Sequence, residues 1–158
     1  SAGPIFFSQS RVGWRGRTFE MYKFRTMRVD AESRTGPVWA RRNDDRCTPI
    51  GAFLRKWSLD ELPQLFNVLR GDMSLVGPRP ERPVFVEKFS EQLPAYKWRH
   101  QAPVGVTGWA QVNGWRGNTS LRRRLEHDLY YVNHGSLWLD FKILVMTLWC
   151  GFRHKNAY

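Results

Sequence analysis

Residues 58–80 read Ser58-Leu-Asp-Glu-Leu-Pro-Gln-Leu-Phe-Asn-Val-Leu-Arg-Gly-Asp-Met-Ser-Leu-Val-Gly-Pro-Arg-Pro80. Four apolar residues recur at i, i+3, i+4 and i+7, the spacing of one helix face: Leu62, Leu65, Phe66 and Leu69. Gly71 follows them, where a helix is expected to stop. The sequence therefore predicts a short helix, with two adjacent carboxylates, Asp60 and Glu61, at its start.

The position of Pro63 limits where this helix can begin. If Asp60 is the N-cap, Pro63 is the third helical residue, and its missing N–H costs no hydrogen bond. If Ser58 is the N-cap, it forms a capping box with Glu61, but Pro63 then falls where it breaks a backbone hydrogen bond. We therefore expect the later start. In both cases the two carboxylates lie at the N-terminus of a helix.

The carboxylate pair has two interpretations. In the structural one, Asp60 caps the helix and Glu61 complements its dipole. In the chemical one, one carboxylate attacks while the other holds a metal ion, since successive helical residues point about 100° apart and cannot both face one atom. Two features of the sequence favour the chemical interpretation. Arg79 is held between two prolines, and 25 Lys and Arg against 14 Asp and Glu give a net charge of +11.

Residues 58–80 also resemble the signature of the bacterial sugar transferases, which are monotopic phosphoglycosyl transferases. Four further motifs, in order, resemble the same family: Gly3-Pro-Ile-Phe-Phe-Ser-Gln-Ser-Arg-Val-Gly13, Met21-Tyr-Lys-Phe-Arg-Thr-Met27, Gly105-Val-Thr-Gly-Trp-Ala-Gln-Val-Asn-Gly114 and Ser136-Leu-Trp-Leu-Asp-Phe-Lys-Ile-Leu144. The resemblance therefore runs nearly from end to end.

The resemblance implies a reaction. Asp60 would attack the β-phosphorus of a UDP-sugar, UDP-glucose or UDP-galactose, to form a phosphosugar-aspartate and release UMP. Undecaprenyl phosphate would then take the sugar phosphate, in the first membrane step of exopolysaccharide or O-antigen synthesis. The resemblance also implies that Glu61 holds Mg²⁺ and that Arg79, Arg116 and Arg25 contact phosphate. The expected location is the cytoplasmic face of the bacterial inner membrane.

The residues themselves allow these arginines other roles. Strand alternation places Lys23 and Arg25 on one face and Tyr22 and Phe24 on the other, so Arg25 could simply be an exposed strand residue. Arg116 lies in a glycine-flanked loop, residues 113–118, which could bring its guanidinium close to a phosphate or be a surface turn. The resemblance favours phosphate contact for both.

The whole chain, residues 1–158, is expected to be one α+β domain that is mostly helical. Two strands around a turn at residues 13–16 are predicted for residues 5–28, helices for 49–57, 81–93 and 121–132, and an extended segment for 103–112. Residues 29–49 are charged and are expected to end as a loop. Arg122, Arg123 and Arg124 are expected to form a solvated basic face.

Residues 137–152 form the most apolar segment. A helix of this length spans roughly 24 Å, less than the hydrocarbon core of about 30 Å. It is therefore either a buried core helix or a helix in the membrane interface. The family normally carries a hydrophobic membrane helix just before the point where this sequence begins, so we expect a fragment of a longer protein.

The charge of +11 implies an anionic partner: a phosphate group, an acidic membrane surface or nucleic acid. The four histidines have no metal-ligand spacing, which argues against a zinc site. A nucleic-acid-binding module and a non-catalytic scaffold on the membrane surface remain alternatives. We favour the enzyme and expect no nucleic acid partner, because the arginines are scattered among Gly and Pro turns. The sequence leaves open whether the chain forms a homodimer.

Overall fold

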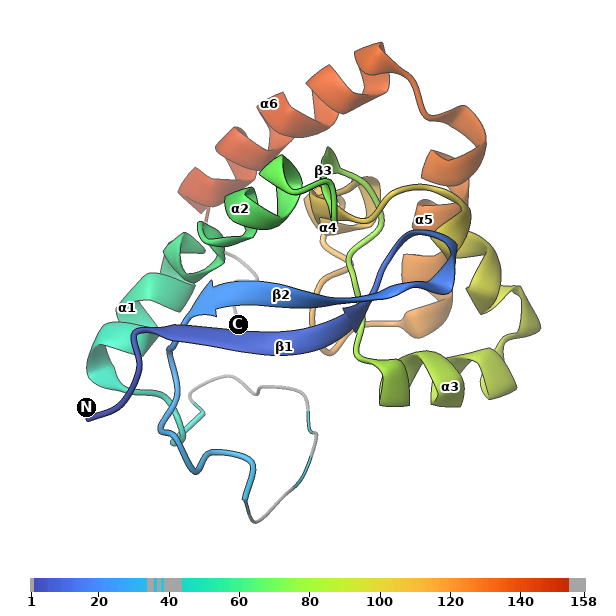
Figure 1. Ribbon diagram of the computed structural model, residues 1–158. Coiled ribbons are helices and arrows are strands. Elements are labelled where there is room, and N and C mark those ends of the chain that lie inside the picture. The colour runs from blue at the N-terminus through green and yellow to red at the C-terminus, as the bar shows by residue number, and fades with distance from the viewer. Residues whose placement is uncertain (1, 34–35, 37, 39–43, 154–158) are drawn as a thin grey trace.

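The structure is a computed structural model that describes residues 2–33, 36, 38 and 44–153 (Figure 1). Part of the predicted charged loop, residues 34–35, 37 and 39–43, lies outside the described residues. The expected α+β class is confirmed. The elements follow in the order β1 (Phe6–Val12), η1 (Trp14–Gly16), β2 (Thr18–Phe24), α1 (Pro49–Lys56), η2 (Leu59–Glu61), α2 (Gln64–Leu69), β3 (Ser74–Val76), α3 (Pro83–Gln92), η3 (Pro94–Gln101), β4 (Gly105–Thr107), α4 (Trp109–Val112), α5 (Leu121–His134) and α6 (Leu137–Arg153).

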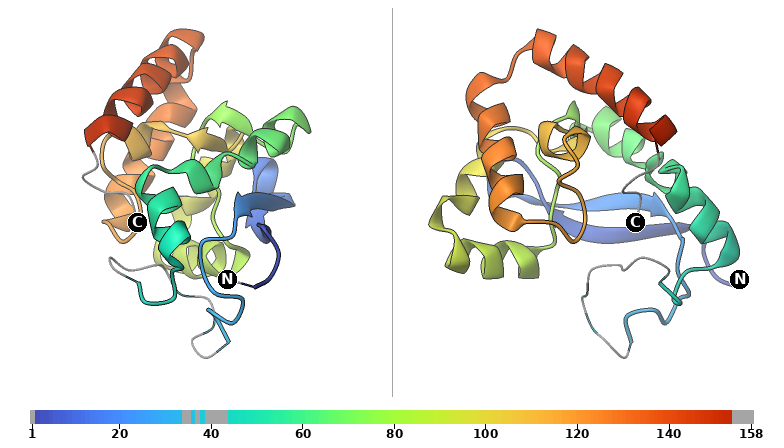
Figure 2. Two further views of the ribbon diagram at one scale, coloured as in Figure 1. Left: turned by 90° about the vertical axis from the view of Figure 1, so that its left-hand side faces the viewer. Right: turned by 180° about the vertical axis from the view of Figure 1, so that it is seen from behind.

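The predicted hairpin of β1 and β2 runs through the middle of the molecule (Figure 1). The strands are antiparallel, and their register pairs Phe6 with Phe24 and Val12 with Thr18. The turn residues have positive φ, 54° at Arg15 and 77° at Gly16. Helices α2 and α6 lie above the hairpin and α3 lies below it, in Figure 1 and in the view from behind (Figure 2).

A second, parallel pair joins β3 to β4. The two backbones approach so closely that only glycine fits at the crossing. A Cβ on Gly77 would lie 2.1 Å from the carbonyl oxygen of Pro103, and one on Gly105 would lie 2.1 Å from the nitrogen of Gly77. Strand β4 confirms part of the extended segment predicted for residues 103–112. Residues 109–112 instead form α4.

The single helix predicted to start after Asp60 is wrong. Asp60 lies in the 3-10 turn η2, and Pro63 is the N-cap of α2. The Ser58 capping box is also not formed, because the side chain of Ser58 makes no cap. The buried face of α2 is polar: Asn67 accepts a hydrogen bond from Tyr22 N at 3.0 Å and donates one to Glu20 O at 2.8 Å.

The four apolar residues found by their spacing therefore face outward, three on α2 and Leu62 just before it. Leu69 is 83% exposed and Phe66 is 60% exposed. The edge of β2 offers unpaired backbone groups that an amide can satisfy and a leucine cannot. This need explains why the polar side of α2 turns inward.

The predicted helices at 49–57, 81–93 and 121–132 are confirmed as α1, α3 and α5. Small apolar clusters hold these elements together: Met21 with Met73 and Val104, Val76 with Tyr131 and Ile143, and Phe89 with Tyr96 and Leu125. Helix α6 contributes Ile143, which is fully buried, while Leu137 is 89% exposed. Within the described residues, no helix combines the length and apolar character needed to cross a membrane.

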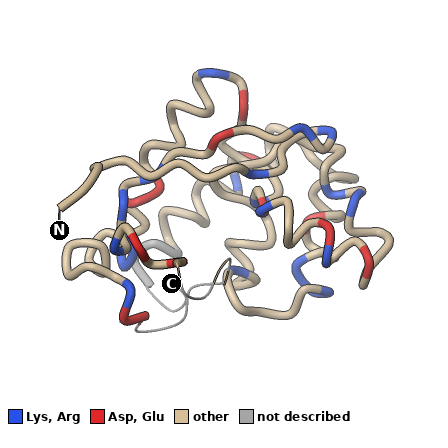
Figure 3. Tube along the Cα trace, turned by 60° about the horizontal axis from the view of Figure 1, so that its bottom comes forward, with Lys and Arg blue, Asp and Glu red and all other residues tan. Residues whose placement is uncertain are grey.

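The basic residues do not gather on one helix. Figure 3 shows Lys and Arg spread over strands, loops and helices. The expected solvated face of α5 is only partly correct: Arg122 and Arg123 are exposed, but Arg124 is buried and lies 3.2 Å from Glu81. Arg124 can be buried because the carboxylate of Glu81, in the segment just before α3, pairs with its charge.

Candidate active site

The 3-10 turn η2 carries the two carboxylates that the sequence singled out. Asp60 and Glu61 are both buried, with 7% and 6% of their surfaces exposed. The turn begins at Ser58, whose φ of 54° lies in the left-handed region. This conformation is uncommon for a residue with a side chain. It lies between α1 and η2, and η2 packs against both α1 and β2, so that Asp60 and Glu61, which we call the dyad, lie beside the β-hairpin.

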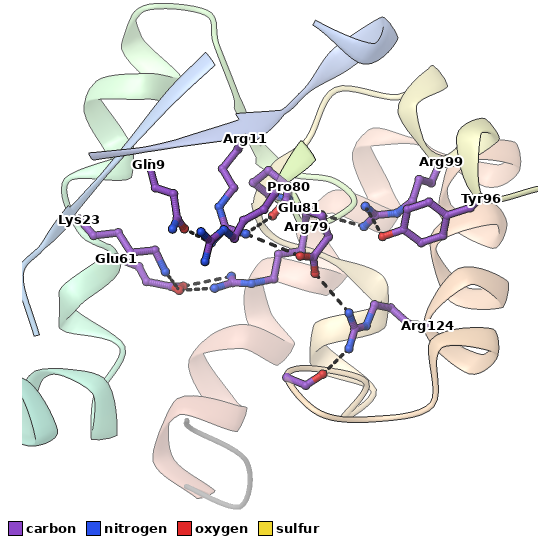
Figure 4. A network of polar contacts seen from close by, with 12 residues as sticks. Gln9, Arg11, Lys23, Glu61, Arg79, Pro80, Glu81, Tyr96, Arg99 and Arg124 are labelled. Atoms are coloured by element: carbon purple, nitrogen blue, oxygen red, sulfur yellow. Dashed lines mark hydrogen bonds and ion pairs between the residues drawn. The ribbon is translucent and has the colours of Figure 1, made fainter. Parts of the chain in front are cut away.

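Glu61 is surrounded by three cations from three parts of the chain, two of which, Lys23 and Arg79, are seen in Figure 4. Its Oε1 accepts a hydrogen bond from Lys23 Nζ at 3.0 Å and lies 3.2 Å from Arg116 Nη2. Arg79 donates to both carboxylate oxygens, from Nη1 to Oε2 at 3.3 Å and from Nη2 to Oε1. Burial by itself raises the pKa of Glu61, but the three cations together hold it well below the usual value. Glu61 is therefore ionised at neutral pH.

Asp60 has a different environment. Among the described residues, no group hydrogen-bonds to its carboxylate, in contrast to the crowded carboxylate of Glu61. Burial, followed by the charge of Glu61, raises the pKa of Asp60, against the effects of Lys23 and Arg116. A buried carboxylate with a raised pKa near cations is typical of a functional group.

Two of the three predicted arginines reach the dyad. Arg79 does so from the loop after β3, where the flanking Pro78 and Pro80 are fully buried. Arg116 binds Glu61 and also donates from Nη1 to Ser58 Oγ at 3.2 Å. The loop of residues 113–118 thus closes over the turn that carries the carboxylates.

Arg25 lies elsewhere. Its Nε donates to the carbonyl oxygen of Pro4 at 2.7 Å, and its Nη1 donates to that of Met27 at 3.2 Å. These contacts fix the chain around the N-terminal strand, and the proposed phosphate contact of Arg25 stays a prediction. Lys23, two residues earlier on the same strand face, is the cation that reaches Glu61. Sequence reasoning placed both on one face and selected Arg25 as a phosphate ligand, but did not find that Lys23 contacts Glu61.

Glu61 does not fit a magnesium ligand in this arrangement, since both of its oxygens are already hydrogen-bonded to cations. Among the described residues, no group of three or more His, Cys, Asp and Glu side chains could hold a metal ion. Magnesium sites at phosphates often use only one or two carboxylates together with the phosphate oxygens. Asp60, whose carboxylate makes no hydrogen bond within the described chain, suits that arrangement better than Glu61.

Within the described chain, a carboxylate without hydrogen bonds thus lies beside a cluster of guanidinium and ammonium groups, an arrangement that suits an anionic substrate. A family model described as bacterial sugar transferase matches residues 1–154. The chain belongs to the bacterial sugar transferase family.

Curated relatives agree with this assignment. The UDP-glucose:undecaprenyl-phosphate glucose-1-phosphate transferase of Xanthomonas campestris pv. campestris is 48% identical over 162 residues, covering 100% of this chain and 34% of the relative. The protein of the same name from Escherichia coli (strain K12) is 45% identical, covering 100% and 35%. A UDP-N-acetylgalactosamine-undecaprenyl-phosphate N-acetylgalactosaminephosphotransferase of Aeromonas hydrophila is 47% identical over 150 residues, covering 94% and 35%. The chain thus spans about a third of the length of these relatives.

Proposed function

We propose that the chain transfers a hexose 1-phosphate from a UDP-sugar to undecaprenyl phosphate and releases UMP, with Asp60 as the nucleophile. The observation that carries the proposal is the contrast within the dyad. Glu61 binds three cations, while the carboxylate of Asp60 makes no hydrogen bond within the described chain. The names of the relatives support a sugar-phosphate transfer to undecaprenyl phosphate.

In the first step, a carboxylate oxygen of Asp60 attacks the β-phosphorus of the UDP-sugar. The bond from this phosphorus to the bridging oxygen breaks, and UMP leaves with the bonding electrons. The product is an acyl phosphate that joins Asp60 to the sugar phosphate. In the second step, an oxygen of undecaprenyl phosphate attacks the same phosphorus, which frees Asp60 and forms undecaprenyl-diphosphate-sugar.

The cations around Glu61 supply the electrostatic part of the reaction. Lys23, Arg79 and Arg116 carry three positive charges against the single negative charge of Glu61. Their surplus charge suits a diphosphate, and the planar guanidinium groups can bind phosphate oxygens in pairs. Glu61 thus has the role of holding the three cationic side chains next to the nucleophile.

Magnesium is part of the proposal as a partner of the substrate diphosphate and Asp60. When bound there, the ion would neutralise phosphate charge. UMP release in EDTA, followed by titration with MgCl₂, tests the requirement. Full activity in EDTA would contradict it.

The sugar is proposed to be glucose or galactose. The relatives named for UDP-glucose are 45–48% identical to this chain, but the one named for N-acetylgalactosamine is 47% identical. The percentage of sequence identity therefore does not distinguish glucose from N-acetylgalactosamine as the donor sugar. A panel of UDP-glucose, UDP-galactose and UDP-N-acetylgalactosamine identifies the donor, and sole use of the last would contradict the proposal.

We also propose that the chain works on an anionic membrane surface, at the cytoplasmic face of the inner membrane. Helices α1, α2 and α6, together with Leu62 just before α2, expose large apolar side chains. We call this set the apolar surface: Ile50, Phe53, Leu62, Leu65, Phe66, Leu69, Leu137, Trp138, Phe141, Val145, Leu148 and Trp149. A soluble monomer rarely exposes so many large apolar groups together. Contact with a bilayer would bring the dyad close to its lipid substrate.

The decisive experiment measures UMP release and the intact mass of the protein. The chain is incubated with each UDP-sugar, with and without undecaprenyl phosphate in detergent, alongside Asp60→Asn and the control Asp45→Asn. Asp45 is an exposed carboxylate in the segment before α1. The proposal expects a mass gain of one hexose phosphate without lipid, lost in Asp60→Asn and kept in Asp45→Asn. Normal turnover by Asp60→Asn would exclude Asp60 as the nucleophile.

A further inference from the structure

The loop of residues 78–81, which presents Arg79, is held entirely from outside. Each of its four carbonyl oxygens accepts a hydrogen bond from another part of the chain, β4, η3 or β1: Pro78 from Gly105 N at 3.0 Å, Arg79 from Arg99 Nη2 at 2.7 Å, Pro80 from Arg11 Nη1 at 3.2 Å and Glu81 from Val12 N at 2.8 Å. Two of the four donors are guanidinium groups. The position of the loop therefore depends on two side chains as well as on two backbone N–H groups, unlike a turn that closes on its own hydrogen bonds.

The prolines explain this dependence. Pro78 and Pro80 have no N–H, so they cannot donate hydrogen bonds within the loop. Their fixed φ angles set the local shape of the chain, but they do not determine where the loop lies relative to η2. That position decides whether the guanidinium of Arg79 reaches Glu61. The group that binds the carbonyl of Arg79 is thus well placed to control the direction of its side chain.

That group is Arg99 of η3, which is fully buried. Asp128 of α5 accepts a hydrogen bond from its Nε at 2.9 Å and lies 2.8 Å from its Nη2. The remaining nitrogen, Nη1, donates to the hydroxyl of Tyr96 at 3.3 Å (Figure 4). All three nitrogens are therefore in use, and only one of their targets, the carbonyl oxygen of Arg79, belongs to the loop.

A buried ion pair of this kind is a poor source of stability. The cost of removing both charges from water can exceed their attraction, and well-packed apolar residues often do as well or better. The Arg99–Asp128 pair makes more sense as a rigid support, because the guanidinium fork offers donors in fixed directions. Asp128 fixes the fork, and the fork fixes the carbonyl of Arg79.

We propose that Arg99, oriented by Asp128, is a positioning residue. It holds the backbone of Arg79 where the guanidinium group of Arg79 can reach Glu61. The inference rests on the proposed function, in which Arg79 contacts the phosphates of the substrate. Arg99 acts through the backbone of Arg79 and has no contact with Asp60 or Glu61 within the described chain.

The kinetic test is a double-mutant cycle between Arg99 and Arg79. Arg99→Lys keeps the positive charge but removes the planar guanidinium group. Asp128→Asn keeps the shape of the side chain but removes the negative charge that orients the guanidinium group of Arg99. Each is expected to lower kcat by about 10- to 100-fold, the effect of a small misplacement in a catalytic site. In the Arg79→Gln background the same changes are expected to have little further effect, because the group that they position is gone. Arg123→Gln, at an exposed pair on α5, is the matched control.

The same double-mutant cycle can be measured on the midpoints of urea denaturation, which does not require enzymatic turnover. If Arg99 positions Arg79, the shifts caused by Arg99→Lys and Arg79→Gln are non-additive, because the first change already weakens the contact that the second removes. Non-additive losses support the inference. Additive losses in both kcat and the urea midpoint would overturn it, since Arg99 would then be a structural residue only. If the wild-type chain releases no UMP, the proposed function fails, and the urea cycle alone decides whether the two residues are coupled.

Discussion

Lys23 Nζ lies 3.0 Å from Glu61 Oε1, joining the open end of the hairpin to the turn that carries the dyad. The two side chains are 18% and 7% exposed, so the pair is largely shielded from water. A lysine in such a position supplies a charge that can be lost near neutral pH. This sets Lys23 apart from Arg79 and Arg116, whose guanidinium groups stay charged.

Lys23 is expected to give the reaction an alkaline limit. Burial lowers the pKa of Lys23 to about 8, although Glu61 opposes the shift. The amine is therefore charged below about pH 8 and neutral above it, so binding of the UDP-sugar weakens as the pH rises through 8. A profile of KM for the UDP-sugar from pH 6.5 to 9.5 measures this. Lys23→Arg keeps its charge and is expected to remove the rise in KM; an unchanged profile would contradict the assignment.

The two carboxylates are expected to respond in opposite ways to loss of charge. Glu61→Gln removes the one carboxylate that, among the described residues, forms ion pairs with Lys23, Arg79 and Arg116, and leaves these cations to repel one another. We expect a loss of about 3 kcal/mol in the free energy of unfolding, in the range found when a buried pair loses one partner. Urea denaturation at pH 7 measures it, and Glu61→Asp, which keeps the charge, is the control.

Asp60→Asn is expected to stabilise the fold. Because the pKa of Asp60 is raised in the folded protein, the folded state holds its proton more tightly than the unfolded state does. The unfolding free energy therefore falls as the pH rises from the usual pKa of Asp through the raised one, and ionised Asp60 costs stability at pH 7. Urea midpoints from pH 3.5 to 7 are expected to separate, with Asp60→Asn above the wild type at pH 7. A lower midpoint at pH 7 would contradict this.

Arg116 is expected to need its guanidinium fork, because it bridges Ser58 Oγ and Glu61 Oε1, each at 3.2 Å. Arg116→Lys can reach only one target at a time and is expected to lower kcat/KM for UMP release by about 10- to 100-fold. Ser58→Ala removes only the hydroxyl acceptor, so we expect a loss of a few-fold at most. Equal losses in both variants would indicate that Arg116 serves to hold the turn, with no contact to substrate.

Local patterns in the sequence predicted much of the fold. The hairpin, α1, α3 and α5 follow from alternation, turn glycines and the proline at the start of α3. The dyad and Arg79 followed from the segment 58–80. The site needed tertiary information at one point in particular: Lys23 and Arg25 share a strand face, and only the packing of η2 against β2 shows that Lys23 reaches Glu61.

Helix α2 shows the limit of spacing arguments. The apolar residues do share a face, but spacing cannot tell whether that face is buried. Asn67 turns inward because its amide satisfies the backbone of Tyr22 and Glu20, an interaction that depends on a strand more than forty positions away in the sequence. The strands β3 and β4 are three residues each and are separated by twenty-eight residues, so the local pattern indicated an extended segment at β4 but not its pairing with β3.

The apolar surface is expected to bind a bilayer, and single charges on it test this. Phe66→Glu on α2 and Leu148→Glu on α6 each place a carboxylate where an apolar side chain would be buried in lipid. Loss of one such side chain is worth about 1.5–3 kcal/mol, or roughly 10- to 100-fold in affinity. Val84→Glu is the matched control, since Val84 is 53% exposed on α3, below the hairpin in Figure 1. Flotation with phosphatidylglycerol vesicles measures binding. Equal binding by all three variants would mean that the basic charge alone holds the chain to lipid, and the apolar surface would then need another partner.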